Sequence, residues 1–256
     1  MQRMSSQAVH FNPLAYPVAM ANVEWMSGTS GWIGHAPFAM ALMQMLAPRL
    51  LVELGTYKGD SYFAFCQAVA ALGLTTRCCA IDTWRGDPQA GMMPDGDQVL
   101  AALRGYHDPR YSQFSTLMQS DFDAAAPGFA DGSIDLLHID GCHTYDAVKN
   151  DYQTWRPKLS DRAIVLFHDT QVRDPGFGVH QFWTELIPGK PHFEFHHAAG
   201  LGVIAVGTHA PAPFMHFLST ANQAPDVVRQ YFTRLGERLI LVVNNNHLAR
   251  QAQART

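Results

Sequence analysis

The chain has 256 residues, of which 47% are hydrophobic and 16% are charged, and its formal net charge is −4. A chain of this length and apolar content can bury a substantial core as one large α/β domain or two small ones, and its composition excludes a disordered protein. The lack of a basic excess argues against sequence-independent nucleic-acid binding. No segment reaches the ~20 apolar residues that a membrane-spanning helix needs.

The four cysteines, at positions 66, 78, 79 and 142, lack the paired spacing of a metal site, and three of them lie in apolar runs. Reduced, buried thiols are the simpler interpretation, and disulfides are the alternative. The first residues also lack the unbroken apolar segment of an export signal. We therefore expect a cytoplasmic protein.

Taken in chain order, the predicted elements alternate between strands and helices. Residues up to about Trp32 are interrupted by Pro and Gly and predict loops and short helical turns, followed by a helix from Pro37 to Ala47. Strands are predicted at 49–54, 76–82, 115–121, 134–139 and 163–170, with a terminal hairpin at 192–197 and 201–207. Helices are predicted at 61–72, 98–107, 146–159, 178–187 and from 225 onward, and a polar loop at 83–97. This alternation indicates a mostly parallel, doubly wound sheet to which the hairpin adds an antiparallel member.

The last predicted helix has apolar residues at helical spacing, which indicates one buried stripe. The stripe consists of Val227, Val228, Phe232, Leu235, Leu239 and Val242. We expect it to pack on the core or on a second subunit, which makes a homodimer one prediction of the sequence.

In doubly wound sheets, ligands bind beyond the carboxyl ends of the strands, and the first strand is followed there by "VELGTYKGDS". A dinucleotide fingerprint needs a glycine two places after Gly55, where this chain has Tyr57, and this difference argues against NAD. The glycine spacing around Lys58 also excludes a Walker loop. Glu53 and the turn up to Gly59 could instead hold the ammonium and carboxylate of an amino-acid ligand near a helix N-terminus. A plain strand-to-helix turn is the alternative.

Polar residues also end the second and third strands. Asp82 could accept hydrogen bonds from both hydroxyls of a ribose, and Ser120 with Asp121 lies where an adenine edge would be. Each acid alone could be a helix cap or a solvated turn. Three polar strand ends in succession favour S-adenosylmethionine (SAM) as the ligand.

The fourth and fifth strands end in Asp140 and in His168 followed by Asp169. These strands are usually neighbours in such a sheet, so the two carboxylates could face each other and hold Mg²⁺ or a similar cation. His143 lies just beyond Asp140 and could remove a proton from a substrate hydroxyl. Asp140 could alternatively cap a helix or contact the methionine end of SAM, His143 could be structural, and His168 could be a metal ligand or a hydrogen-bond partner of one.

These residues resemble those of class I SAM-dependent methyltransferases, specifically the group often found beside or fused to bacterial glycosyltransferases. The resemblance runs from about Leu51 to Gly207 and is carried by "VELGTYKGDSY", "AIDTWRGD", "YHDPRY", "ADGSIDLLHIDGCHTYDAVKNDYQTWRPKLSDRAIVLFHDT", "FGVHQFWTEL" and "GLGVIAVG". More distantly, the chain resembles metal-dependent macrolide-sugar O-methyltransferases and cephalosporin-hydroxylase-like proteins. There an aspartate and a histidine three places later supply a metal ligand and the base, a spacing that Asp140 and His143 match.

The resemblance implies a Rossmann-like seven-stranded sheet with a final antiparallel strand, and methyl transfer to oxygen. It implies a cofactor site formed by Glu53, Gly55, Thr56, Tyr57, Gly59, Ser61, Asp82, Thr83, Trp84, Ser120, Asp121 and Asp140. The implied catalytic residues are His143, Asp140 and Asp169, and the implied metal ligands are Asp140, Asp169 and His168. His168 is a departure, because the metal-dependent relatives usually carry an acid there. The segment "PQAGMMPDGD" also differs from the family pattern, and we expect it to belong to a substrate lid.

The sequence therefore predicts SAM-dependent O-methylation of a sugar hydroxyl on a glycan, glycolipid or glycosylated natural product, assisted by a divalent metal. Metal-free methylation of an amine or another small molecule is an alternative, and so is a non-catalytic partner of a glycosyltransferase. We expect an N-terminal extension and lid at 1–48, the methyltransferase domain at 49–208, and a C-terminal helical extension at 209–256, joined in one structural domain. No nucleic-acid partner and no membrane span are expected.

Overall fold

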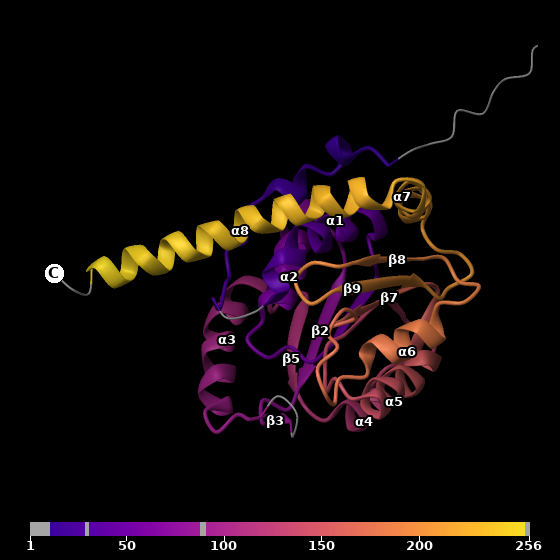
Figure 1. Ribbon diagram of the computed structural model, residues 1–256. Helices are drawn as coiled ribbons and strands as arrows, with labels where there is room; N and C mark the ends of the chain where they lie inside the picture. The colour runs from indigo at the N-terminus through magenta and orange to yellow at the C-terminus, as the bar shows by residue number, and fades with distance from the viewer. Residues whose placement is uncertain (1–10, 29–30, 88–90, 254–256) are drawn as a thin grey trace, which may run out of the picture.

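The computed structural model describes residues 11–28, 31–87 and 91–253. A seven-stranded sheet in the order β5-β2-β1-β6-β7-β9-β8 forms the centre of the fold (Figure 1). Its strands are β1 (Leu50–Leu54), β2 (Arg77–Asp82), β5 (Ser115–Gln119), β6 (Ile134–Ile139), β7 (Leu159–His168), β8 (His192–Phe195) and β9 (Leu201–Ala205). The first five of these pair in parallel, and β9 lies antiparallel between β7 and β8. The predicted seven-stranded, doubly wound sheet with an antiparallel final strand is confirmed.

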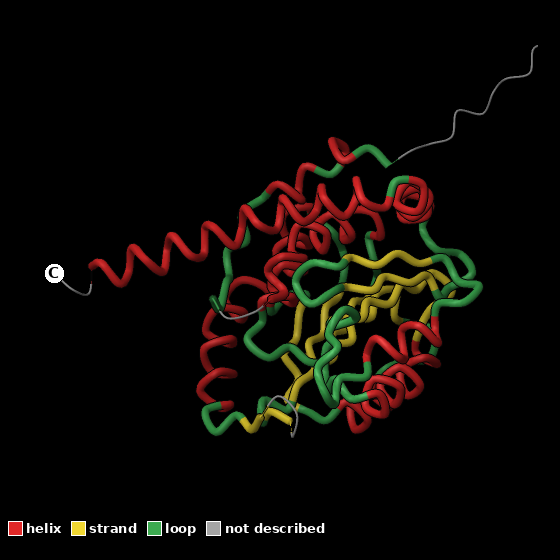
Figure 2. Tube along the Cα trace, viewed as in Figure 1, coloured by secondary structure: helices red, strands yellow, loops and turns green. Residues whose placement is uncertain are grey.

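Helices cover both faces of the sheet (Figure 2). One face carries α1 (Ala36–Leu46), α2 (Asp60–Leu72), α3 (Gly96–Tyr111), α7 (Ala212–Gln223) and α8 (Pro225–Gln253). The other carries α4 (Phe122–Ala125), α5 (Tyr145–Trp155) and α6 (Val179–Leu186). Short 3₁₀ turns are η1 (Pro13–Ala15), η2 (Pro17–Met20), η3 (Gly31–His35), η4 (Ala126–Gly128) and η5 (Arg156–Lys158), and a separate two-stranded hairpin pairs β3 (Gly86–Asp87) with β4 (Gly91–Met92).

The two helical layers are separated because successive strand residues point to opposite faces of the sheet. In β1, Leu51 packs against the layer of α1 and α2, and Val52 packs against the layer of α5 and α6. The same alternation in the neighbouring strands fills both cores with β-branched and aliphatic side chains. The central strands are consequently buried on both sides.

β7 starts at Leu159 rather than at the predicted position 163, and a polar cluster around Asp135 lies beside this extension at the amino end of the sheet. The Asp135 carboxylate is 3% exposed and accepts hydrogen bonds from the backbone N–H and the guanidinium of Arg49. It also accepts one from the Ser160 hydroxyl at 2.6 Å. This contact holds Ser160 against β6 and extends the ladder toward the N-terminal end of β7.

The C-terminal helix α8 crosses the outside of the α1 layer, and its last turns extend beyond the body of the protein (Figure 1). Val228, Phe232 and Leu239 are buried in the core, so the packing prediction is confirmed for these positions. Val227 does not pack on this core, because its side chain is 67% exposed. The buried face of α8 is the face that packs against η3 and α1.

The polar loop predicted at 83–97 contains the β3–β4 hairpin and the first turn of α3, and its Pro88–Ala90 lie outside the described residues. The predicted extension at 1–48 likewise includes residues 1–10 and 29–30 that are not described. All four cysteines are free, with Cys142 half-buried and the other three buried. In the described part of the chain, no helix is long and apolar enough to cross a membrane.

Candidate active site

The carboxyl ends of β1, β2 and β6 are tied together at Gly55. Gly55 has φ of 88°, and a Cβ at this position would lie 2.1 Å from the carbonyl oxygen of Asp140. Its N–H donates to the Ile81 carbonyl at 2.9 Å, and the Asp140 N–H donates to the Leu54 carbonyl at 2.8 Å. Only glycine fits this conformation and this close approach. The turn after β1 is therefore held directly against the loop that begins at Asp140.

Asp82, at the end of β2, closes the same turn. Its Oδ2 accepts the backbone N–H groups of Thr56 and Tyr57 at 2.9 and 2.8 Å, and its Oδ1 accepts that of Trp84 at 2.7 Å. A carboxylate offers about four lone-pair sites, so three are used and one on Oδ1 stays open. The predicted contact with two ribose hydroxyls therefore has room for one at this carboxylate.

A cavity of about 690 Å³ opens beyond these strand ends, within the usual size range of small-molecule sites. Nine residues of the predicted site line it: Gly55, Tyr57, Asp82, Thr83, Asp121, Asp140, His143, His168 and Asp169. The structure thus brings the predicted cofactor turn and the predicted catalytic residues to one cavity. The β3–β4 hairpin, part of the predicted lid segment, contributes Gly86, Gly91 and Met92 to its wall.

Glu53 lies behind the cavity wall and not in it, which differs from its predicted contact with an ammonium group. It is fully buried, and its Oε2 lies 2.8 Å from Nδ1 of His138 on the neighbouring strand β6. The Trp32 indole N–H donates to Nε2 of His138 at 3.2 Å, so that nitrogen is the acceptor and Nδ1 carries the proton. Strand alternation directs Glu53 toward η3 and α2, where this network supports the turn from beneath.

The other predicted cofactor residues outside the cavity lining shape the turn. Thr56 and Ser61 are buried, and Gly59 is the N-cap residue before α2, with φ of 82°. Trp84 is 1% exposed, and its indole N–H donates to the carbonyl of Tyr57 at 2.9 Å. Ser120 donates its hydroxyl to the backbone of the next residue. These side chains fix the loop conformation.

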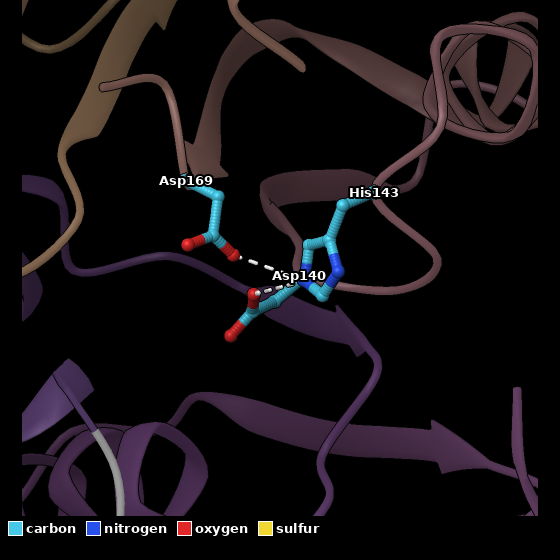
Figure 3. Close-up of side chains that lie close together, drawn as sticks. All are labelled: Asp140, His143 and Asp169. Carbon is cyan, nitrogen blue, oxygen red and sulfur yellow. Dashed lines mark ion pairs between the residues drawn. The ribbon is translucent and has the colours of Figure 1, made fainter. Parts of the chain in front are cut away.

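Asp140, His143 and Asp169 point toward one another at the ends of the adjacent strands β6 and β7 (Figure 3). One donor atom from each lies within 4.8 Å of the others. Nε2 of His143 is 2.9 Å from Oδ2 of Asp169 and 3.9 Å from Oδ1 of Asp140. Asp169 has φ of 61°, an unusual conformation for a non-glycine residue and one that clusters at functional sites.

His168 completes the cluster from the buried side. Its Nδ1 is 3.3 Å from Oδ1 of Asp140 and 3.1 Å from Oδ2 of Asp169. Its Nε2 lies 3.1 Å from the carbonyl oxygen of Ala198 in the β8–β9 turn. The predicted pair of facing carboxylates is thus accompanied by two imidazoles.

The charges of the cluster shift its pKa values. Burial alone would lower the pKa of His143, but its interactions with Asp140 and Asp169 outweigh burial and raise the pKa to about 10. The same balance of burial against the two aspartates raises the pKa of His168 to about 10. Burial would raise the pKa of Asp140, but the charge of His168 and the contact with His143 hold it well below its ordinary value. The two carboxylates thus favour the charged form of both imidazoles when no cation is bound.

Several residues of the site were missed from the sequence. Phe122, Cys142 and Lys58 line the cavity, and the ring of Phe177 stacks on His143 with centroids 5.0 Å apart. Phe122 directly follows the strand-end acid Asp121, so its position was a usable signal. Phe177 comes from a loop whose path only the folded chain reveals.

In comparisons with known proteins, the chain is similar to methyltransferases. Residues 52–170, which run from within β1 to just beyond the end of β7, match a family model described as a methyltransferase domain. The chain is 41% identical over 238 residues to the uncharacterised protein y4gI of Sinorhizobium fredii, in a match that covers 92% of this chain and 26% of that protein. The chain thus spans about a quarter of the length of this curated relative.

Solved structures with the same fold include a putative caffeoyl-CoA O-methyltransferase from Staphylococcus aureus, which is 15% identical with a TM-score of 0.52 over 67% of this chain and 82% of that one. The SAH-bound methyltransferase PaMTH1 of Podospora anserina is 15% identical with a TM-score of 0.51, over 67% and 77%. The O-methyltransferase TomG of Streptomyces achromogenes, in complex with SAM, is 13% identical with a TM-score of 0.50, over 77% and 97%. The family match supports the predicted methyltransferase domain over residues 52–170, and the solved structures confirm the predicted fold.

Proposed function

We propose that this domain transfers a methyl group from SAM to a hydroxyl of a sugar, on a glycan, glycolipid or glycosylated natural product. The observation that carries the proposal is that Asp140, His143 and Asp169 line the same cavity as the glycine turn and Asp82. A cofactor in the turn would face a base and two carboxylates across one cavity. Oxygen acceptors need such a base, because a sugar hydroxyl must lose its proton as it is methylated.

The turn fits the amino-acid and ribose parts of SAM. Gly55 lines the cavity beside this turn, and the N-terminus of α2 favours a carboxylate nearby. The open lone pair on Oδ1 of Asp82 would accept one ribose hydroxyl. Asp121 and the ring of Phe122 line the part of the cavity that the adenine would occupy.

The reaction would be an in-line displacement. The acceptor oxygen forms a bond to the methyl carbon, the carbon–sulfur bond breaks, and S-adenosylhomocysteine (SAH) leaves with that electron pair on its sulfur. The hydroxyl proton passes to Nε2 of His143. The ring of His143 stacks on Phe177, and its backbone carbonyl accepts the Gly178 N–H at 2.7 Å. Holding the oxygen and the methyl carbon in line near van der Waals contact supplies a large part of the rate.

The carboxylates of Asp140 and Asp169 fit a divalent cation, with an imidazole completing the donor set. A bound cation would lower the pKa of the acceptor hydroxyl, orient it, and offset the carboxylate charge that raises the pKa of His143. These residues would then have separate tasks. The two acids hold the cation, and His143 takes the proton.

The length of the Sinorhizobium relative supports a domain that works within or beside a larger protein, and we propose a glycosyltransferase as that partner. The exposed Val227, Ile240 and Leu241 on α8 support a homodimer through this helix. Four free thiols support a reducing compartment, the cytoplasm.

The test is a labelled-methyl transfer assay with SAM and a panel of saccharides, with and without a chelator. Transfer to a saccharide that His143→Ala and Asp169→Asn abolish, and His196→Ala leaves unchanged, would support the proposal. His196 is a suitable control because its side chain is 50% exposed and lies outside the cavity lining. Transfer to amines that needs no metal would replace the proposal with N-methylation. SAH binding without transfer to either class would indicate a non-catalytic partner.

A further inference from the structure

The surroundings of His168 decide which of its ring nitrogens carries a proton. The carbonyl of Ala198 can only accept, so Nε2 of His168, 3.1 Å away, must donate. His35 donates to the same carbonyl from its own Nε2 at 3.1 Å. A neutral His168 therefore presents the lone pair of Nδ1 to Asp140 and Asp169. Its side chain is 8% exposed, so water has little access to compensate.

When Nδ1 carries no proton, this arrangement places three hydrogen-bond acceptors close together. Nδ1 of His168 is 3.3 Å from Oδ1 of Asp140 and 3.1 Å from Oδ2 of Asp169, and ionised carboxylates also only accept. Either a second proton on the ring or a cation between the three atoms relieves the repulsion. In a six-coordinate ion with bonds of about 2.1 Å, neighbouring donors lie about 3 Å apart, which matches both distances. His143 fits less well, because its Nε2 is 3.9 Å from Asp140.

The turn that supplies the carbonyl is itself strained. Ala198 and Ala199 have φ of 50° and 70°, in the left-handed region that alanine rarely adopts. The carbonyl of Ala199 accepts the N–H of Gln171, which ties this turn to the segment after β7. Metal-ligating histidines usually donate their other N–H to a carbonyl or carboxylate, which fixes the ring and its tautomer. The β8–β9 turn has this relation to His168.

We propose that His168 is a direct ligand, with Asp140 and Asp169, of a transition ion such as Co²⁺, Mn²⁺ or Zn²⁺, and that the site prefers such ions to Mg²⁺. This inference rests on the proposed function, of which it names the metal class. Imidazole nitrogen suits transition ions, whereas Mg²⁺ takes oxygen donors and water. His143 remains outside the coordination sphere as the base.

The experiment compares metal binding by the whole chain after chelator treatment and desalting. Titration calorimetry with Co²⁺ and with Mg²⁺ should give at least about tenfold tighter binding of Co²⁺. In His168→Ala, Co²⁺ should bind about 10- to 100-fold more weakly. In His168→Asp, which replaces nitrogen by oxygen, the preference should shift toward Mg²⁺ by about tenfold or more. The exposed His196→Ala should match the unchanged chain, and equal SAH affinity should show that each variant is folded.

A second readout identifies the ligand directly. In the Co²⁺-loaded protein, proton NMR should show a strongly shifted, exchangeable imidazole N–H signal from His168. The hydrogen bond to the Ala198 carbonyl should slow the exchange of this proton with water. That signal should be lost in His168→Ala and His168→Asp and kept in His196→Ala. Its persistence in His168→Ala, or tighter binding of Mg²⁺ than of Co²⁺ by the unchanged chain, would overturn the inference and leave the methyltransferase proposal standing. If the chain binds no divalent cation but still transfers methyl groups, the metal would play no part in the reaction, which would overturn this inference and the metal-assisted version of the proposed function.

Discussion

Replacing Asp82 with Ala should weaken both the fold and cofactor binding, because this carboxylate serves both. It accepts three backbone N–H groups, of which those of Thr56 and Trp84 belong to buried residues, while that of Tyr57 belongs to an exposed one. Hydrogen bonds to a charged group contribute about 1.5–3 kcal/mol each. Losing the two buried ones should lower the free energy of unfolding by about 3 kcal/mol, the lower end of their sum, since water from the cavity can replace part of the loss.

Urea unfolding followed by tryptophan fluorescence measures the stability term, and calorimetry with SAH in native buffer measures the binding term. SAH affinity should fall by roughly tenfold or more, because a ribose hydroxyl loses its charged acceptor. Asp82→Asn is the matched variant: its amide oxygen can keep the bonds to Thr56 and Tyr57, so it should cost less stability than Ala. An Asp82→Ala protein with an unchanged unfolding curve would refute the role in the turn, and one with unchanged SAH affinity would refute the ribose contact.

Three further predictions follow from the site and its supports. His143→Ala should lower turnover by roughly 10²–10⁴-fold, measured by labelled-methyl transfer, with partial recovery at high pH where the acceptor hydroxyl ionises; full activity would exclude His143 as the base. Burial alone would raise the pKa of Asp135, but its hydrogen bonds from arginine and serine hold it at about 2, below the ordinary 3.8. The resulting stabilisation of about 2 kcal/mol should be present above pH 4 and lost as the pH falls through 2. The free energy of unfolding of Asp135→Asn should therefore change less with pH in this range than that of the unchanged chain, and the same pH dependence in both would contradict the pairing. Gly55→Ala should cost roughly 3 kcal/mol or more, from its positive φ and its contact with the Asp140 carbonyl, and abolish SAH binding. Gly105→Ala in the interior of α3, where a Cβ meets no atom within 4 Å, should instead stabilise the protein by up to about 1 kcal/mol in thermal unfolding.

Much of the fold was predictable because its signals are local. The apolar runs that end in Asp82, Asp140 and Asp169 mark buried strands and the residues beyond them, and the sheet brings these ends together as expected. The Asp140–His143 spacing alone indicated an acid and an imidazole in one loop. Such features depend on period and order along the chain, which a sequence displays directly.

The unpredicted parts depend on contacts between distant segments. Glu53 points away from the cavity and pairs with His138, which in turn accepts a hydrogen bond from Trp32. Trp32 reaches His138 only because the N-terminal segment folds over the sheet. Val227 fits the helical period as well as Val228 does, and only the direction of α8 against η3 decides which is buried. The Ala198 carbonyl that orients His168 comes from an alanine turn with no glycine signal at that position.

The cavity has two walls, the strand ends and the β3–β4 hairpin, and they differ in how readily they tolerate substitutions. The strand-end wall is joined by backbone hydrogen bonds and the close contact at Gly55, so substitutions there disturb the glycine turn and the Asp140 loop together. The hairpin forms a sheet of its own and presents Met92, 70% exposed, to the cavity. Acceptor preference can therefore diverge between related enzymes, or be re-engineered, by exchanging the residues between Gly86 and Met93 while the transfer chemistry stays constant.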